Sequence, residues 1–248
     1  MSKPQTMSGP AEELDRALSQ TSEGAGMANS SQSSEGQLRF PALERWRGLP
    51  RNAPRDEYFR VLREAGVEFY LADPQNPYQQ SGRSSGARRW EETRRCLVQA
   101  LHRDGDFLDV GCANGLLLES LIAWAHENGL SIRPHGIDLV PELIDLARQR
   151  FPDRAECFGV VNAFYWSPRR QYDFVRTNLE YVPEPDWITF VERQYAAVAP
   201  GGRLILCHYR NPEEPYVDVA IVAERAGHSV IGRTEAPGVA IAWIQRPK

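Results

Sequence analysis

The chain has 248 residues, of which 42% are apolar and 25% charged, as in an ordinary globular protein. Acidic residues outnumber basic ones by 33 to 29 and there is no basic stripe, which argues against binding to nucleic acid. No uncharged apolar run approaches the roughly 18 residues that a membrane span needs, so we expect no membrane partner.

Residues 1–39 contain no aromatic side chain and are rich in Ser, Gly, Gln and Glu. Such a segment cannot bury enough apolar area to offset the entropy lost on ordering, so we expect a disordered tail. It lacks the basic start and apolar centre of a secretory signal, which favours a cytoplasmic location. The true start of translation stays open among Met1, Met7 and Met27.

The segment 40–103 predicts helices joined by loops, and we expect it to form a helical cap ahead of the main domain. Apolar side chains recur on one stripe within 55–65, and Gly66 predicts the end of that helix. Proline, asparagine and glycine make 73–82 turn-rich, and a second helix is expected over 89–102.

From 104 to 248, short apolar runs alternate with helical patterns. Parallel strands need crossover connections, so this alternation predicts an α/β domain whose doubly wound sheet carries helices on both faces. The last two runs are close enough in sequence to form an antiparallel hairpin. We therefore expect a seven-stranded, mostly parallel sheet with an antiparallel C-terminal hairpin strand. The expected strands are 106–111, 131–139, 157–161, 172–177, 203–208, 229–234 and 239–244.

The first of these strands runs into the loop Asp109-Val-Gly-Cys-Ala-Asn-Gly115. Gly111 leaves room where the backbone turns sharply and a ligand must approach, and Gly115 opens the following helix, whose free N–H groups attract an anion. Asp109 interrupts an apolar strand, where a buried carboxylate needs a partner such as a ligand cation or a loop N–H. In open α/β sheets, ligands bind beyond the carboxyl ends of the strands, where this loop lies.

The sequence D-V-G-C-A-N-G resembles the first motif of class I S-adenosylmethionine-dependent methyltransferases, usually D/E-x-G-x-G-x-G, with Ala113 in place of the middle glycine. The resemblance extends over roughly 107–246 in the order of elements and implies S-adenosylmethionine as the cofactor. It implies that the methionine half of the cofactor is held by Asp109, Gly111, Cys112, Ala113 and Gly115.

Further positions match landmarks of the same family. Asp138 closes the second strand, where the family's acidic residue binds both ribose hydroxyls, although a helix-capping role is also open. Leu139 would then lie near the adenine. Asn162 and Ala163 occupy the place of a Gly-Asp-Ala motif after the third strand, and the amide could accept from the adenine amino group. The turn at 200–202 resembles the family's Pro-Gly-Gly entry into the fifth strand.

A nicotinamide-binding fold is the alternative for a glycine loop after a first strand. Its G-x-G-x-x-G pattern needs three glycines, whereas Gly111 and Gly115 stand four apart with no match for the middle one. Its strand is also normally apolar where Asp109 lies, so S-adenosylmethionine is favoured. Cysteines and histidines show no metal-ligand spacing, and no metal is expected.

Candidates for the acceptor side follow the fourth and fifth strands. Methyl transfer mainly requires an acceptor in line with the departing sulfur, and it needs a general base only when the acceptor arrives protonated. Asn178 and Tyr181 match the ends of the N-P-P-Y tetrad of amino-group methylases, but the middle positions depart from it, so that mechanism is not expected. Glu180 and Tyr181 are candidates for orienting the acceptor and His208 for taking a proton, while Asn178 and Tyr78 are expected to contact the cofactor.

These residues predict a cytoplasmic S-adenosylmethionine-dependent methyltransferase that acts on oxygen or nitrogen of a small molecule. A protein acceptor and a catalytically silent methyltransferase-like binding module are the alternatives, because fold does not determine function. The sequence specifies neither the acceptor nor the oligomeric state.

Overall fold

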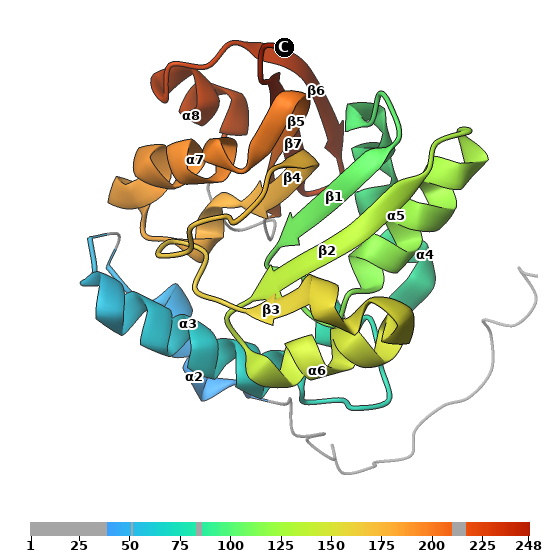
Figure 1. The fold of residues 1–248 in the computed structure, drawn as a ribbon. Coiled ribbons are helices and arrows are strands. Elements are labelled where there is room, and N and C mark those ends of the chain that lie inside the picture. The colour runs from blue at the N-terminus through green and yellow to red at the C-terminus, as the bar shows by residue number, and fades with distance from the viewer. Residues whose placement is uncertain (1–38, 51, 83–85, 210–216) are drawn as a thin grey trace, which may run out of the picture. The chain divides into compact units, whose positions relative to one another are not determined.

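Seven strands form one sheet in the computed structural model, in the order β3-β2-β1-β4-β5-β7-β6 (Figure 1). The strands β1 to β5 pair in parallel, whereas β7 is antiparallel to both β5 and β6. This arrangement confirms the predicted seven-stranded, mostly parallel sheet with antiparallel C-terminal strands. The strands are β1 Gly105–Val110, β2 Ile132–Asp138, β3 Phe158–Val160, β4 Tyr172–Asn178, β5 Val198–Tyr209, β6 Val230–Ala236 and β7 Val239–Gln245.

The structure describes residues 39–50, 52–82, 86–209 and 217–248, and contacts group Phe40–Lys248 into one unit. The disordered tail predicted for 1–39 lies, apart from Arg39, outside the described residues. No helix in the described part of the chain is both long and apolar enough to cross a membrane.

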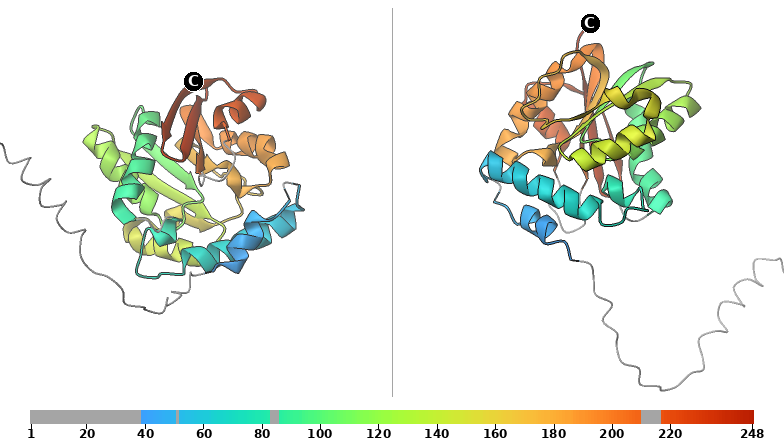
Figure 2. Two further views of the ribbon diagram at one scale, coloured as in Figure 1. Left: turned by 180° about the vertical axis from the view of Figure 1, so that it is seen from behind. Right: turned by 60° about the horizontal axis from the view of Figure 1, so that its bottom comes forward.

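Helices cover both faces of the sheet and one of its ends (Figures 1 and 2). One face carries α4 Gly86–Arg94, α5 Leu116–Glu127 and α6 Pro141–Arg150. The other face carries α7 Trp187–Ala196 and α8 Val219–Arg225. The helix α3 Arg55–Tyr70 lies across the carboxyl ends of the parallel strands, next to the loop expected to bind a ligand, and α2 Pro41–Arg47 packs against α3.

Strand side chains alternate between two apolar cores, one on each face of the sheet. Leu108 of β1 and Val175 of β4 pack with α7 and α8, while Phe107 and Phe174 pack with α4, α5 and α6. This double burial explains why the parallel strands are apolar along their length. A polar residue within such a strand, as at Asp109, therefore requires a specific partner.

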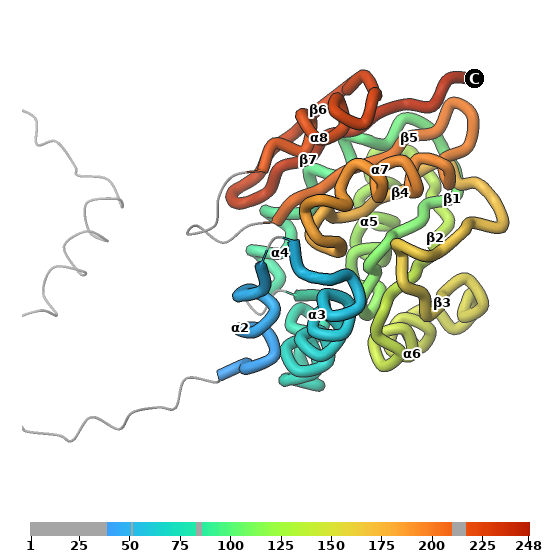
Figure 3. Tube along the Cα trace, turned by 90° about the vertical axis from the view of Figure 1, so that its left-hand side faces the viewer, coloured from blue at the N-terminus to red at the C-terminus, as the bar shows by residue number. Residues whose placement is uncertain are grey.

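The prediction that Gly66 ends its helix is wrong, because α3 continues through it to Tyr70. A Cβ at Gly66 would lie 3.0 Å from Cγ2 of Val140, so the glycine lets α3 pack closely on the loop after β2. In Figure 3, α3 lies beside α6, and the two helices share a small apolar cluster. This packing places the side chains of α3 over the strand ends.

Two other expected boundaries also shift. The helix predicted over 89–102 divides into α4 and a 3₁₀ segment, Arg95–Ala100. The fifth strand begins at Val198 and runs through Pro200–Gly202, which the sequence predicts as a turn before the strand. Gly201 has φ +71°, and the pairing register shifts beside it, so the irregularity is absorbed inside the strand.

Candidate functional site

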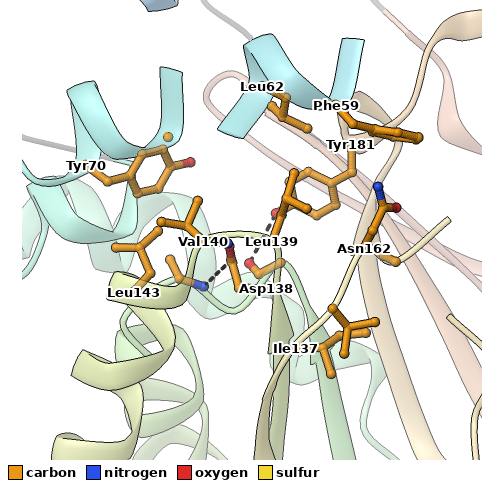
Figure 4. Close-up of a pocket in the computed structure, with 15 residues that line it drawn as sticks. Phe59, Leu62, Tyr70, Ile137, Asp138, Leu139, Val140, Leu143, Asn162 and Tyr181 are labelled. Atoms are coloured by element: carbon orange, nitrogen blue, oxygen red, sulfur yellow. Dashed lines mark hydrogen bonds between the residues drawn. The ribbon is translucent and has the colours of Figure 1, made fainter. Parts of the chain in front are cut away.

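A pocket with about 630 Å³ of empty space, its open mouth included, lies at the carboxyl ends of β1, β2 and β3 beneath α3 (Figure 4). The strand ends form its floor, and Phe59 and Leu62 descend on it from α3. The predicted site residues that line it are Gly111, Ala113, Asp138, Leu139, Asn162, Ala163 and Tyr181.

Gly111 lies against the ring of Tyr181 in this pocket. Its φ is +79°, and a Cβ there would lie 2.3 Å from ring atoms of Tyr181. The Tyr181 hydroxyl donates to the carbonyl oxygen of Gly111 at 3.2 Å. The glycine is therefore required both by the left-handed turn and by the ring that lies on it.

Ala113 is the one non-glycine residue with positive φ in the described part of the chain, at +47°. Left-handed backbone costs an L-residue roughly 1–2 kcal/mol, a cost that glycine avoids. We expect Ala113→Gly to raise the free energy of unfolding by about 0.5–1 kcal/mol, because the added entropy of the unfolded chain offsets part of the gain. Urea denaturation would measure this change, and a destabilised variant would contradict it.

Asp138 joins the loops after β1 and β2. One carboxylate oxygen accepts from the N–H of Ala113 at 2.9 Å and the other from the N–H of Val140, also at 2.9 Å. Burial raises the pKa of Asp138, although these N–H groups oppose the shift. Each oxygen keeps a further lone pair that can accept from a ligand.

Asn162 borders the pocket from the end of β3. Its side-chain oxygen accepts from the N–H of Phe164 at 3.0 Å, which forms a local turn. The amide oxygen, expected from the sequence to accept from adenine, is thus already bonded within the chain. This oxygen keeps a further lone pair, so the side chain can offer a ligand both that acceptor and its amide nitrogen as a donor.

Beside the pocket, a buried chain of hydrogen bonds links β1 to β4. Arg176 donates from one nitrogen to Asp109 at 2.9 Å and from the other to Asn178 at 2.6 Å. Asn178 donates in turn to the hydroxyl of Tyr181 at 3.0 Å. Burial raises the pKa of Asp109 to about 6, although Arg176 opposes this shift. The network holds the Tyr181 ring in place over Gly111.

An arginine is therefore the partner of one Asp109 carboxylate oxygen, where the sequence predicts a ligand cation or a loop N–H. The other oxygen is buried without a partner among the described residues. Asp109 and Arg176 pair directly in the register of β1 and β4, and both are almost fully buried. Sequence reasoning missed Arg176. The pattern that could have identified Arg176 is a charged residue inside an otherwise apolar strand, as at Asp109.

Five predicted cofactor residues do not line the pocket. Two of them, Asp109 and Asn178, belong to the buried chain of hydrogen bonds beside it. Cys112 points behind the loop, where a Cβ at Gly136 would lie 2.6 Å from its sulfur. Gly115 caps α5 with φ +77°, and a Cβ there would lie 3.1 Å from the ring of Phe151. Tyr78 packs edge-on against Trp90, with ring centroids 6.0 Å apart.

Asn114 is a second residue that sequence reasoning missed. It is fully buried, and its amide donates to the carbonyl of Pro77 at 3.0 Å and to Gln80 at 3.2 Å. Its side-chain oxygen accepts from the N–H of Leu116 at 3.1 Å and from the hydroxyl of Ser81. Asn114 therefore ties the β1 loop to the segment that precedes the sheet.

The acceptor-side candidates lie together after β4 and β5. Glu180 accepts from Asn178 at 3.3 Å, and its other oxygen lies 3.4 Å from Nδ1 of His208. That approach lacks hydrogen-bond geometry, and both ring nitrogens of His208 are buried without a partner among the described residues. The structure thus brings Asn178, Glu180, Tyr181 and His208 into one cluster.

Residues 79–229, more than half of the chain, match the model of a methyltransferase-domain family. The chain belongs to the class I S-adenosylmethionine-dependent methyltransferases. Membership in this family identifies S-adenosylmethionine as the cofactor and excludes the nicotinamide alternative.

Curated relatives of this methyltransferase domain include trans-aconitate 2-methyltransferases. The Methylobacterium radiotolerans protein is 32% identical over 108 residues, or 44% of this chain and 39% of that protein. The Rhizobium meliloti protein is 31% identical over 111 residues, or 45% of this chain and 41% of that protein. The chain therefore aligns with about two-fifths of the length of these relatives.

Solved methyltransferases share the fold. The 1,6-didemethyltoxoflavin-N1-methyltransferase of Burkholderia thailandensis superposes with a TM-score of 0.58 at 17% identity, covering 79% of this chain and 92% of that one. The N-methyltransferase NodS of Bradyrhizobium japonicum gives a TM-score of 0.51 at 18% identity, covering 71% and 100%.

Proposed function

We propose that this chain transfers a methyl group from S-adenosylmethionine to oxygen or nitrogen of a small-molecule acceptor, with a carboxylate oxygen as the favoured atom. The observation that carries the proposal is the pairing of a partly buried carboxylate, Asp138, with the glycine loop of β1 in one pocket. When bound, S-adenosylmethionine supplies a methyl group already activated by its sulfonium.

The pocket residues fit the nucleoside half of this cofactor. Asp138 would accept from the ribose hydroxyls through its spare lone pairs. The Asn162 amide nitrogen would donate to a ring nitrogen of adenine, and Leu139 and Ala163 would contact the base. The described residues include an apolar wall on α3, formed by Phe59 and Leu62, that would exclude water.

The remaining predicted residues serve the loop and the acceptor side in this proposal. The β1 loop would be supported, on its side away from the pocket, by Asp109, Cys112 and Gly115. Gly111 would leave room for the methionine half of the cofactor. Asn178 would hold Tyr181, whose hydroxyl stays protonated because burial raises its pKa. Tyr181 and Glu180 would orient the acceptor.

A carboxylate acceptor suits the geometry around His208. A carboxylic acid is already ionised near neutral pH, so its oxygen needs no general base before it attacks the methyl carbon. Among the described residues, neither ring nitrogen of His208 has a hydrogen bond that would fix its tautomer, whereas a catalytic imidazole normally has such an orienting partner. The trans-aconitate 2-methyltransferase relatives favour the same class of acceptor.

Transfer of labelled methyl from S-adenosylmethionine to a panel of carboxylic acids, phenols and amines would test this function. We expect labelled product with carboxylic acids, and base hydrolysis of the ester should release labelled methanol. Calorimetry should show binding of S-adenosylhomocysteine by the same preparation. Binding without turnover on the panel would favour a silent binding module, and label incorporated only into protein would favour a protein acceptor.

A further inference from the structure

Arg94, the last residue of α4, is buried but has no carboxylate partner in the described part of the chain. It is 6% exposed, and the hydrogen bond recorded for its guanidinium goes to the neutral hydroxyl of Thr93, at 2.6 Å. The other buried arginine among the described residues, Arg176, is paired with Asp109. Burying a cation without a counter-ion is costly, so this guanidinium is suited to bind an anionic ligand.

Two aromatic rings hold the Arg94 guanidinium. Its central carbon lies 4.6 Å from the ring centroid of Trp90 and 4.2 Å from that of Tyr209. Contacts of this kind are favourable and occupy the faces of the guanidinium, while its N–H groups point outward in its plane. That planar edge is the one that binds a carboxylate with two parallel hydrogen bonds.

The hydroxyl of Tyr209 is a second unsatisfied group at the same place. It is buried without a hydrogen-bond partner among the described residues. Burial raises the pKa of Tyr209 to about 12, so the hydroxyl keeps its proton and can donate to an anion. Leaving a buried hydroxyl unbonded is unfavourable, and a ligand oxygen would satisfy it.

This pair adjoins the acceptor-side cluster. Tyr209 ends β5, one residue beyond His208, and its ring centroid lies 5.4 Å from the guanidinium carbon of Arg176. Arg176 bonds Asn178, which contacts both Glu180 and Tyr181. An anion bound at Arg94 would therefore lie beside the cluster that is proposed to receive the acceptor.

We propose that Arg94 and Tyr209 form a carboxylate subsite that selects anionic acceptors. The acceptor class is a small di- or polycarboxylic acid, of which one carboxylate binds at Arg94 and another presents the oxygen that is methylated. The subsite rests on the proposed methyl transfer for its role, whereas its binding of an acid does not require turnover.

Calorimetry on the full chain loaded with S-adenosylhomocysteine tests the subsite with trans-aconitate, citrate and succinate, and with the trimethyl ester of trans-aconitate. We expect at least one acid to bind and the uncharged ester to bind at least tenfold more weakly. Arg94→Gln should weaken acid binding about 10-fold or more, Tyr209→Phe about 3- to 10-fold, and Arg94→Lys should restore part of the loss. Arg95→Gln is the matched control, because Arg95 pairs at the surface with Glu91 and Glu127.

Affinity for S-adenosylhomocysteine, measured in the same variants, separates the possible roles. We expect it to stay within about twofold in Arg94→Gln. A parallel loss would show that Arg94 binds the cofactor, and failure of every acid to bind the wild-type chain would also overturn the subsite.

Acid binding without methyl transfer would refute the proposed function alone, whereas methyl transfer to an acid unaffected by Arg94→Gln would refute the subsite alone. If Arg94→Gln does not fold, Arg94→Lys and Tyr209→Phe give the same comparison.

Discussion

Gly111→Ala is expected to lower the free energy of unfolding by about 2–5 kcal/mol, because it combines a left-handed backbone with overpacking. The new methyl group would lie 2.3 Å from the ring of Tyr181, which is itself held by Asn178. The ring must move, and its hydrogen bond to the Gly111 carbonyl is then lost. Chemical denaturation would measure the stability, and calorimetry with S-adenosylhomocysteine would record a matching loss of affinity.

Gly129→Ala provides a matched control for Gly111→Ala. Its φ is +73°, close to that of Gly111, but a Cβ there would meet no atom within 4 Å. The control therefore carries only the backbone cost of roughly 1–2 kcal/mol. The double variant Gly111→Ala/Tyr181→Ala should recover part of the lost stability, since it removes the clashing ring. Equal destabilisation by the two single variants would show that Tyr181 does not constrain Gly111.

The alternation of apolar runs was sufficient to predict the sheet, because each parallel strand is buried on both faces and each crossover carries a helical stripe. The residues at which helices begin and end were harder to predict from the sequence. At Gly66 the local rule that glycine ends a helix fails, because contact with Val140 favours a residue without a side chain inside α3. Tertiary packing decides that position, and a single sequence contains no sign of the neighbour.

Within the candidate site, the residues of local motifs could be predicted and their distant partners could not. The loop motif identified Asp109 as a buried acid, but its cation, Arg176, lies 67 residues away and becomes a neighbour only when β1 and β4 pair. The apolar wall formed by α3 could not be predicted from the sequence for the same reason. Its residues, Phe59 and Leu62, follow an ordinary apolar stripe whose target depends on where α3 packs.

Asp138→Ala is expected to weaken the binding of S-adenosylhomocysteine about 10- to 100-fold, because hydrogen bonds to a charged group contribute roughly 1.5–3 kcal/mol. This expectation rests on the proposed role of the carboxylate as the acceptor for the ribose hydroxyls. The same substitution removes the bonds to the N–H groups of Ala113 and Val140, so part of the loss could arise from a loosened loop. Asp138→Asn keeps an acceptor oxygen without the charge. Calorimetry on this variant and on the wild-type chain would therefore separate the contribution of the charge from that of the acceptor oxygen.

A cofactor analogue without one hydroxyl separates ribose binding from loop support. If Asp138 accepts from the ribose, the penalty of Asp138→Ala should shrink severalfold for 2′-deoxy-S-adenosylhomocysteine, since the bond is already missing from the ligand. If Asp138 only stabilises the loop through its bonds to backbone N–H groups, Asp138→Ala should weaken the binding of both ligands by the same factor. Asp145→Ala, a change at an exposed residue of α6 that pairs with Arg148, should leave both affinities within about twofold. An unchanged affinity in Asp138→Ala would remove the carboxylate from the binding site altogether.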